Sequence, residues 1–235
     1  MLISNAKHLT IDERSIVRLS IGNKVIWKGL PSGYTALDYI EATGTQYIDT
    51  NFKANQDTRI VCDIMWMGGM NGFGARQAVA TRNFSVRVIS DTWQLGYGSD
   101  GGVATGTVAA KLNEWQTVDI NKNSLYVDGK FSVSREYVSF TTPQTLALGA
   151  IKAGSSTPSM YYGTAKYRGC QIYNNGVLVR DMTPCKDPNG NIGMYDTVNA
   201  VFYGNAGTGE FAYTEASSTT SDLGLATLDS MLLGE

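Results

Sequence analysis

The chain has 235 residues, of which 19 are Lys or Arg and 21 are Asp or Glu, so its formal net charge is −2. Charged residues make up only 17% of the chain, whereas 26 residues are Gly and 13 are Tyr. A chain this close to neutrality lacks the excess of cations that displaces counterions from nucleic acid, so we expect no nucleic-acid partner. Its apolar and aromatic content excludes a charged disordered segment, and the lack of a Gly-X-Y period excludes collagen.

The first 15 residues contain no apolar run of the kind found in a signal peptide, and no stretch approaches the ~20 apolar residues of a membrane span. We therefore expect a protein made in a cytoplasm and not inserted into a membrane. Cys62, Cys170 and Cys185 are odd in number and form no CxxC pair. This pattern favours free thiols in a reducing compartment, buried as small hydrophobic side chains.

The first predicted element is a β-hairpin. Two apolar runs, 16–21 and 24–28, flank Gly22-Asn23, and both of these residue types tolerate the positive φ of a tight turn. The segment LPSG at 30–33 then breaks the pattern. We predict a small hairpin element over residues 1–29 and a main domain that starts at residue 30.

The main domain shows a series of short predicted strands. Residues 59–66 alternate strictly between apolar and other residues, with Ile60 and Trp66 on the same face, and residues 84–88 alternate in the same way. Asp128-Gly129 and Asn175-Gly176 each separate two apolar runs and predict tight hairpins. Many short strands with such punctuation predict an all-β sandwich or barrel.

A single helix is predicted near the C-terminus. Asp222 can serve as its N-cap, apolar residues recur at helical spacing over 223–233, and Gly234 would end it. A helix of this length is marginal alone, so its apolar stripe must pack on the chain's own sandwich or on another subunit. We assign residues 214–235 to a linker and this amphipathic helix.

Most catalytic and cofactor-binding patterns are missing. His8, the sole histidine, lies outside the main domain, which disfavours a Ser-His or Cys-His centre and a His-rich metal site. The segment 96–101 matches G-x-G-x-x-G, but residues 103–108 are poor helix formers, so a glycine-rich sandwich loop explains it better than a dinucleotide site. The oxygen-rich segment 187–191 lacks the closing Glu of a calcium loop and predicts a turn. We expect no metal and no other cofactor.

Two segments resemble a known family. They are LPSGYTALDYIEATGTQYIDTNFKAN, residues 30–55, and DPNGNIGMYDTVNAVFYGNAGTGEF, residues 187–211. Between them, the hairpin at 115–129 and the segment Leu146–Gly149 resemble middle strands of the same family. Residues 30–213 are thus similar to concanavalin A-like (laminin-G-like) jelly-roll domains, which are frequent in phages and prophages of Gram-positive and gut bacteria and in surface proteins of their hosts.

The resemblance implies a two-sheet antiparallel jelly roll that is usually non-enzymatic and often recognises glycans or proteins. In virion proteins of this kind the flanking segments commonly dock the domain to the particle. We therefore expect residues 1–29 and the C-terminal helix to contact other virion proteins, and we expect the protein to be located in the virion. A homo-oligomer is also expected, because weak sugar sites gain affinity through multivalency.

Sugar rings are held by aromatic faces beside polar groups, which directs attention to the tryptophans and tyrosines. Trp66 shares a face with apolar residues and Trp115 precedes a core-type strand, so both are predicted to lie in the core. Other aromatic residues lie in polar, glycine-rich regions or interrupt the strand pattern. The predicted glycan site consists of Asp91, Trp93, Tyr97, Asp100, Tyr161 and Tyr162. Ordinary packing at the rim of the sandwich is the alternative for these residues.

Three functions follow from the sequence. The first is a structural protein of a phage virion, in the tail, a fibre or the capsid decoration, whose lectin-like domain binds host-surface or mucosal glycans without catalysis. The second is a purely structural decoration or assembly protein with no carbohydrate ligand. The third is a glycoside hydrolase, which is disfavoured because the E-x-D-x-x-E string of sandwich glycosidases is missing. Glu114 and Asp119, the nearest carboxylates, would point to opposite faces of a strand.

Overall fold

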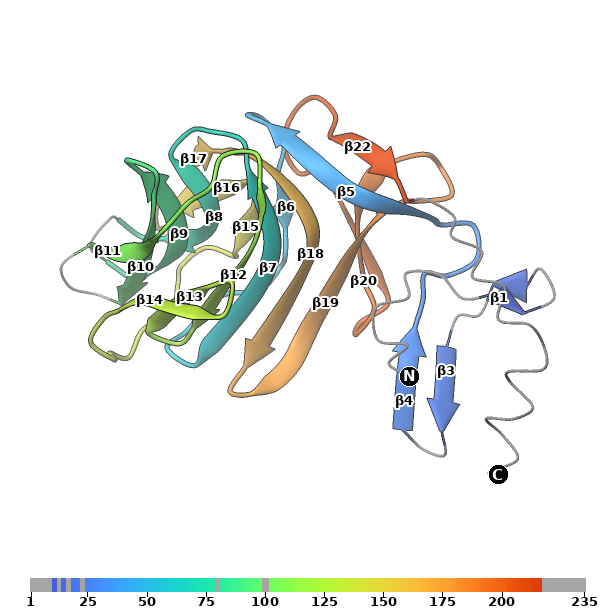
Figure 1. Ribbon diagram of the computed structural model, residues 1–235, viewed down its shortest axis with the longest axis horizontal. Helices are drawn as coiled ribbons and strands as arrows, with labels where there is room; N and C mark the ends of the chain where they lie inside the picture. Colours follow the sequence, from blue (N-terminus) through green and yellow to red (C-terminus); the bar gives the residue numbers. More distant parts are fainter. Residues whose placement is uncertain are drawn as a thin grey trace.

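The computed structural model describes residues 29–78, 81–98 and 102–216, with residue 71 as backbone only, and it gives the backbone of four short strands between residues 10 and 28. This part of the chain is all β, and its main body is a sandwich of two antiparallel sheets (Figure 1). It contains no helix, and hence none that is long and apolar enough to cross a membrane. The helix predicted over 223–233 lies outside the described residues.

The larger sheet is formed by ten of the described strands, which are β5 (Thr35–Thr43), β7 (Thr58–Trp66), β12 (Trp115–Asn121), β13 (Ser124–Val127), β14 (Lys130–Ser134), β18 (Thr164–Asn174), β19 (Val177–Lys186), β20 (Ile192–Asp196), β21 (Val201–Gly204) and β22 (Ala212–Glu215). Their order is β14-β13-β12-β7-β18-β5-β19-β20-β21, and β22 pairs with β5.

The smaller sheet is formed by eight of the described strands, which are β6 (Ile48–Asp49), β8 (Asn71–Arg76), β9 (Asn83–Ile89), β10 (Thr92–Gly98), β11 (Val103–Ala109), β15 (Ala147–Leu148), β16 (Ala150–Ala153) and β17 (Ser159–Tyr162). The order is β11-β10-β9-β8-β15-β6. The strand β16 also pairs with β8, in parallel, and β17 pairs with β16.

The short N-terminal strands form two separate pairs: β1 (Thr10–Ile11) with β2 (Arg14–Ser15), and β3 (Arg18–Ile21) with β4 (Lys24–Lys28). The second pair is antiparallel and joins the two runs that the sequence predicted as a hairpin. The proposed division of the chain at residues 29/30 and 213/214 stays a prediction, and β22 continues past the second of these boundaries to Glu215.

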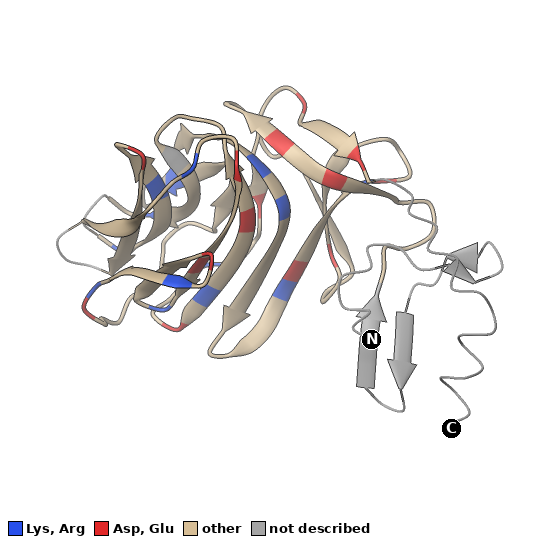
Figure 2. Ribbon diagram, in the orientation of Figure 1, with Lys and Arg blue, Asp and Glu red and all other residues tan. Residues whose placement is uncertain are grey.

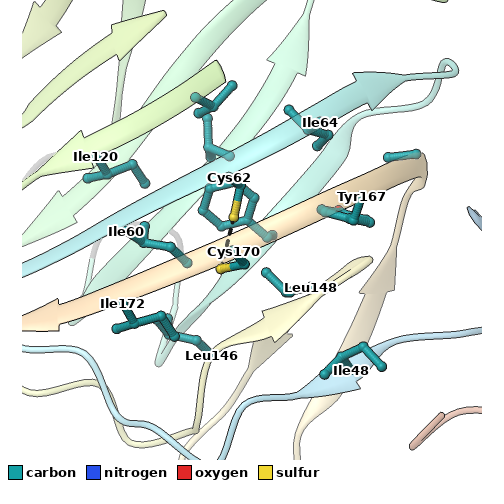
Figure 3. Close-up of a cluster of buried hydrophobic side chains, with 14 of the residues drawn as sticks. Ile48, Ile60, Cys62, Ile64, Ile120, Leu146, Leu148, Tyr167, Cys170 and Ile172 are labelled. Atoms are coloured by element: carbon teal, nitrogen blue, oxygen red, sulfur yellow. Dashed lines mark hydrogen bonds between the residues drawn. The ribbon is translucent and has the colours of Figure 1, made fainter. Parts of the chain in front are cut away.

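The core between the sheets is built from alternating strand residues. On β7 the side chains of Ile60, Cys62, Ile64 and Trp66 point inward and are buried, as the sequence pattern predicted. Cys62 faces Cys170 of β18 in register, and their sulfur atoms are 3.1 Å apart as free thiols (Figure 3). The prediction that all three cysteines are buried and unpaired is confirmed.

Tyr167 of β18 connects the two sheets across this core. Its ring is buried, and its hydroxyl donates to the carbonyl oxygen of Gly72 at 2.7 Å while accepting from the amide of Gly149 at 2.9 Å. Gly149 has φ +89° and stands where the chain reverses from β15 into β16. A Cβ there would lie 2.9 Å from the carbonyl oxygen of Gln46, so the reversal needs glycine. This reversal places β16 alongside β8.

The two hairpins predicted from Asp-Gly and Asn-Gly are present. Asp128-Gly129 joins β13 to β14 and Asn175-Gly176 joins β18 to β19, with positive φ at all four residues. The G-x-G-x-x-G match is different, because its first two glycines, Gly96 and Gly98, lie inside β10. The segment after the match is the strand β11, whereas a dinucleotide site would need a helix there.

The two segments that carry the family resemblance lie side by side. Ile48 forms a β-bridge with Asn205, and the amide of Thr208 donates to the carbonyl oxygen of Thr45 at 3.1 Å. The strand β5, from the first segment, also pairs with β19 just before the second segment begins. These contacts close the sandwich between parts of the chain that are far apart in sequence.

Candidate functional site

Two of the predicted glycan-binding aromatic residues are part of the core instead. Trp93 is 0% exposed and its indole nitrogen donates to Oε1 of Gln116 at 3.1 Å. Tyr97 is 1% exposed, its hydroxyl donates to the carbonyl oxygen of Gln56 at 3.1 Å, and its burial raises its pKa well above the usual value. The prediction that these two rings face a ligand is wrong, because β10 is a regular strand that turns residues 93, 95 and 97 inward.

The other four predicted residues are not brought together. Asp91 is exposed in the turn between β9 and β10, with φ 54°, and Asp100 lies outside the described residues. Tyr161 and Tyr162 are on β17, which is separated from β10 in the smaller sheet by β9, β8 and β16. Tyr161 lines a cavity, and its role in ligand binding stays a prediction.

The cavity has a volume of about 300 Å³ and lies where β8, β16 and β17 end beside one another. Ala153 of β16 pairs in register with Arg76 of β8, and Ser159 of β17 pairs with Ala153. The backbone and side chains around it mix polar and apolar groups. The lining residues are Arg76, Gln77, Ala78, Ala153, Gly154, Ser159 and Tyr161.

Arg76 is the unusual residue of this cavity. It is only 5% exposed, its Cζ atom lies 4.7 Å from the centroid of the Tyr161 ring, and its Nε and Nη1 atoms are buried without a hydrogen-bond partner. Buried donors are almost always paired, because an unpaired one loses its hydration without compensation. Arg168 has one such nitrogen atom, Nε, whereas Arg76 has two and also lines a cavity, which favours a site for an acceptor from outside the protein.

A second arginine lies close enough to Arg76 for their charges to interact. Arg87 stands on β9, next to the strand that carries Arg76, and its Nε atom donates to Oε1 of Gln94 at 2.9 Å. Figure 2 shows how the Lys and Arg residues are distributed along the ribbon. Burial lowers the pKa of Arg87, and the nearby charge of Arg76 lowers this pKa further. Arg87 is not a lining residue, and no acidic residue is among the lining residues, so the lining itself offers Arg76 no counterion.

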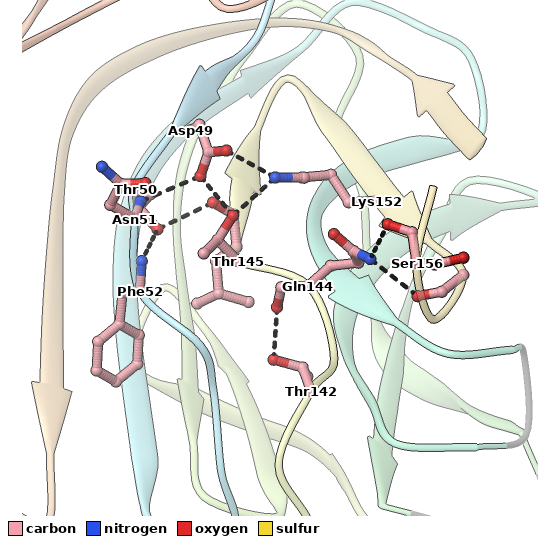
Figure 4. Close-up of polar contacts among 11 residues, drawn as sticks. Asp49, Thr50, Asn51, Phe52, Thr142, Gln144, Thr145, Lys152 and Ser156 are labelled. Atoms are coloured by element: carbon pink, nitrogen blue, oxygen red, sulfur yellow. Dashed lines mark hydrogen bonds and ion pairs between the residues drawn. The ribbon is translucent and has the colours of Figure 1, made fainter. Parts of the chain in front are cut away.

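Hydrogen bonds hold the rim of the cavity in place. The amide of Gly154 donates to the carbonyl oxygen of Arg76 at 3.1 Å. The side-chain amide of Gln144 donates to the carbonyl oxygens of Gly154 at 3.2 Å and Ser156 at 3.4 Å (Figure 4). The loop between β16 and β17 is therefore attached both to β8 and to the segment that precedes β15.

A partly buried ion pair anchors β16 one residue before Ala153, which lines the cavity. Nζ of Lys152 lies 2.6 Å from a carboxylate oxygen of Asp49 on β6 and 2.7 Å from the hydroxyl oxygen of Thr145 (Figure 4). Burial alone would raise the pKa of Asp49, but hydrogen bonds from Lys152, Thr145 and the Asn51 amide outweigh it and hold this pKa below its usual value. Because Asp49 is engaged with Lys152, it does not serve as a counterion for Arg76.

The outer face of the larger sheet carries a second aromatic group that sequence reasoning placed wrongly. Trp115 was predicted in the core, but it is partly exposed, with the guanidinium of Arg168 3.9 Å from its ring centroid. Tyr39 lies 6.1 Å from the same ring, and Arg168 forms an ion pair with Asp38 at 3.3 Å. Val118 and Ile120 of β12 point inward, so an odd-numbered residue on that strand points outward.

The carboxylates considered for catalysis are held in ion pairs. Asp119 accepts from Arg59, with 2.7 Å between Oδ2 and Nη2, and Glu114 lies 3.3 Å from Nζ of Lys111. The Asp187 carboxylate accepts from the side-chain amide of Asn191 and from the backbone amides of Asn191 and Asn189, which lowers its pKa and makes the predicted turn. Across the ranges that the structure describes, no group of three or more His, Cys, Asp or Glu residues is arranged for a metal ion.

Comparison with known proteins identifies the fold. A protein from Bacteroides ovatus that is provisionally described as carbohydrate-binding matches with a TM-score of 0.50 and 11% identity, over 87% of this chain and 66% of that one. A heptameric SAP-like pentraxin from Limulus polyphemus matches with a TM-score of 0.44 and 10% identity (78% and 95% covered). The carbohydrate-binding module CBM66 from Bacillus subtilis matches with a TM-score of 0.33 and 13% identity (56% and 92% covered).

The chain thus spans slightly less than two thirds of the Bacteroides ovatus protein. No family model matches the sequence, and no curated protein does. The match to the Bacteroides ovatus protein is a likeness of fold, which in this chain is an all-β sandwich of two sheets.

Proposed function

We propose that this protein is a non-catalytic, lectin-like carbohydrate-binding protein, and that the cavity between β8, β16 and β17 is its sugar-binding site. The observation that carries the proposal is the arrangement of Arg76 beneath the partly exposed ring of Tyr161. An aromatic face next to fixed polar donors is the combination that holds a sugar, since C–H faces stack on the ring and hydroxyl groups need hydrogen bonds. The fold shared with a protein provisionally described as carbohydrate-binding supports the same function.

We further propose that the protein works in a phage virion as a homo-oligomer, with residues 1–29 and 214–235 as attachment segments. Support for the virion comes from the resemblance of segments 30–55 and 187–211 to phage and prophage jelly-roll domains. An oligomer suits a shallow sugar site, because several weak sites acting together give useful avidity. Immunogold labelling of phage particles and sedimentation of the purified chain test these two statements.

The sugar-binding proposal is tested on a glycan array with the purified full-length chain and two matched variants. Tyr161→Ala removes the partly exposed ring beside Arg76, and we expect it to abolish array signals or weaken them at least tenfold. Tyr213→Ala is the control, because Tyr213 is similarly exposed and also lies near a cation, with Nζ of Lys186 5.7 Å from its ring centroid, but it is on β22. The control variant should bind like the wild type.

The array also separates the proposal from the purely structural alternative. If the wild-type chain binds no glycan while remaining folded, the carbohydrate-binding proposal is wrong and a decoration or assembly role without a ligand takes its place. If Tyr161→Ala and Tyr213→Ala lose array signal equally, the proposal that this cavity is the sugar-binding site is wrong.

A further inference from the structure

We infer that the cavity selects acidic sugars, with Arg76 receiving the carboxylate of a uronic acid or a related sugar acid. This inference rests on the proposed carbohydrate-binding function and adds the class of ligand. It starts from the two buried, unpaired nitrogen atoms of Arg76, which neutral hydroxyl groups would satisfy less well than an anion.

The guanidinium has an unpaired donor on each of its edges. Nε belongs to one edge of the planar group and Nη1 to the other, and neither has a partner. Arg stays protonated at every pH that a protein tolerates, so the donors come with a full positive charge. A carboxylate offers two acceptor oxygens in one plane, which matches either edge of this group.

The charges around the cavity favour an anion as the missing partner. Arg87, on the neighbouring strand and outside the lining, is a second cation that interacts with Arg76, and burial and the charge of Arg76 lower its pKa. Asp49 and Lys152, the residue next to the lining residue Ala153, form an ion pair with each other at 2.6 Å. No Asp or Glu is among the lining residues, so a carboxylate ligand would supply the counter-charge that the lining does not offer Arg76.

The remaining lining groups fit a sugar better than a bare anion. The ring of Tyr161 is 45% exposed and offers a face for a sugar ring, while Gln77 and Ser159 supply an amide and a hydroxyl for its hydroxyl groups. A volume of about 300 Å³ is at the small end of ligand pockets and suits one sugar unit. Among the described strands, β17 pairs only with β16, so Tyr161 stands on an edge strand where its ring can shift to admit the carboxylate.

The test measures affinities of the full chain by isothermal titration calorimetry for methyl glycosides of glucuronic, galacturonic and mannuronic acid and for the corresponding neutral hexosides. We expect at least one uronide to bind at least tenfold more tightly than its neutral counterpart. Arg76→Met should remove that preference. Arg168→Met is the matched control, because Arg168 also lies against an aromatic ring, Trp115, but on the outer face of the larger sheet.

A second variant guards against loss of folding in Arg76→Met, which thermal unfolding would reveal. Tyr161→Ala changes a surface side chain and should weaken uronide and hexoside alike, while the preference for the uronide remains. A shift of the Tyr161 NMR resonances on adding a uronide, but not on adding the hexoside, gives an independent readout on the unmodified chain.

The outcomes separate the inference from the function on which it rests. Equal affinity for uronides and neutral hexosides, with sugars bound, overturns the acidic-sugar inference and leaves the carbohydrate-binding function in place. Binding of sodium acetate as tight as that of the uronides also overturns it, since the cavity would then hold any small anion. No binding of any sugar, on the array or by calorimetry, overturns both.

Discussion

Gly207 packs directly against Thr45, so that a Cβ atom on Gly207 would overlap the carbonyl oxygen of Thr45. Next to this contact the Thr45 hydroxyl donates to the carbonyl oxygen of Thr208 at 2.8 Å, and the Thr208 amide donates back to Thr45. The glycine is therefore needed where the two family-like segments join, and its role there is structural.

Replacing this glycine should destabilise the whole sandwich. Gly207→Ala forces the two backbones apart, and we expect a loss of about 1–3 kcal/mol in the free energy of unfolding, as for overpacked cores. Urea denaturation followed by fluorescence measures it. Gly169→Ala is the control, because its Cβ would meet only the Met182 carbonyl oxygen at 3.5 Å, and it should change stability by less than ~1 kcal/mol. Equal stability of the two variants would contradict the prediction.

The Asp49–Lys152 pair should make stability depend on pH in the acid range. The pKa of Asp49 is lower in the folded chain than its usual value of 3.8, so the pair contributes fully above that value. The contribution is lost as pH falls through 3.8 towards the folded pKa.

Lys152→Met should cost about 2–3 kcal/mol at neutral pH, less than a fully buried pair, since the Asp49 side chain is 29% exposed. As the pH is lowered from about 5 to about 3, the unfolding free energy of this variant should also fall less steeply than that of the wild type. Lys111→Met, which removes an exposed pair with Glu114, should leave both quantities nearly unchanged. Parallel pH curves for wild type and Lys152→Met would refute this account.

The three thiols should be inert in the folded protein. Burial raises the pKa of Cys185 to about 12 and raises the pKa of Cys62 as well, so the reactive thiolate is scarce and shielded. Ellman's reagent at neutral to mildly alkaline pH should label no cysteine until denaturant is added. Ser156→Cys, in the exposed loop after β16, serves as the positive control. Rapid labelling of the native wild type would show that the core opens.

Substitution of Trp93 should affect stability and leave sugar binding unchanged. Trp93→Phe leaves a void between the sheets and removes the hydrogen bond to Gln116, whose Oε1 also accepts from the Lys111 amide. We expect a loss of about 2–3 kcal/mol, measured by denaturation. The affinity per folded molecule, measured by calorimetry, should equal that of the wild type. A weakened affinity at unchanged stability would return Trp93 to the binding site.

Strand alternation was the most informative signal in the sequence, and it was also where the site prediction failed. The pattern over 59–66 predicted the inward face of β7 because polar residues occupy the other face. In β10 the alternate positions hold Gly96 and Gly98, so the inward series of Trp93, Leu95 and Tyr97 resembled a polar loop. For Trp115, the parity with Val118 and Ile120 was available and would have placed the ring outside.

Arg76 carried no recognisable signal in the sequence. Its significance depends on β16 and β17, which lie about 75–85 residues further along the chain and reach β8 only because of the reversal at Gly149. An unpaired buried donor is a property of packing, since it depends on which acceptors surround the group. Tyr161 was predicted because it interrupts the strand pattern, whereas its position over the Arg76 guanidinium emerged only from the fold.

The pairing of β22 with β5 also sets how the domain responds to mechanical load. These antiparallel strands join the first and last parts of the sandwich, and both flanking connections leave at the same end, where the Ala216 amide donates to the carbonyl oxygen of Ala36 at 3.1 Å. Tension between the two flanks would break this bond first and then separate the strands one hydrogen bond at a time. If both flanks are instead pulled in the same direction, the force acts on the corner of the sandwich where β5 and β22 pair, away from β8, β16 and β17 (Figure 1).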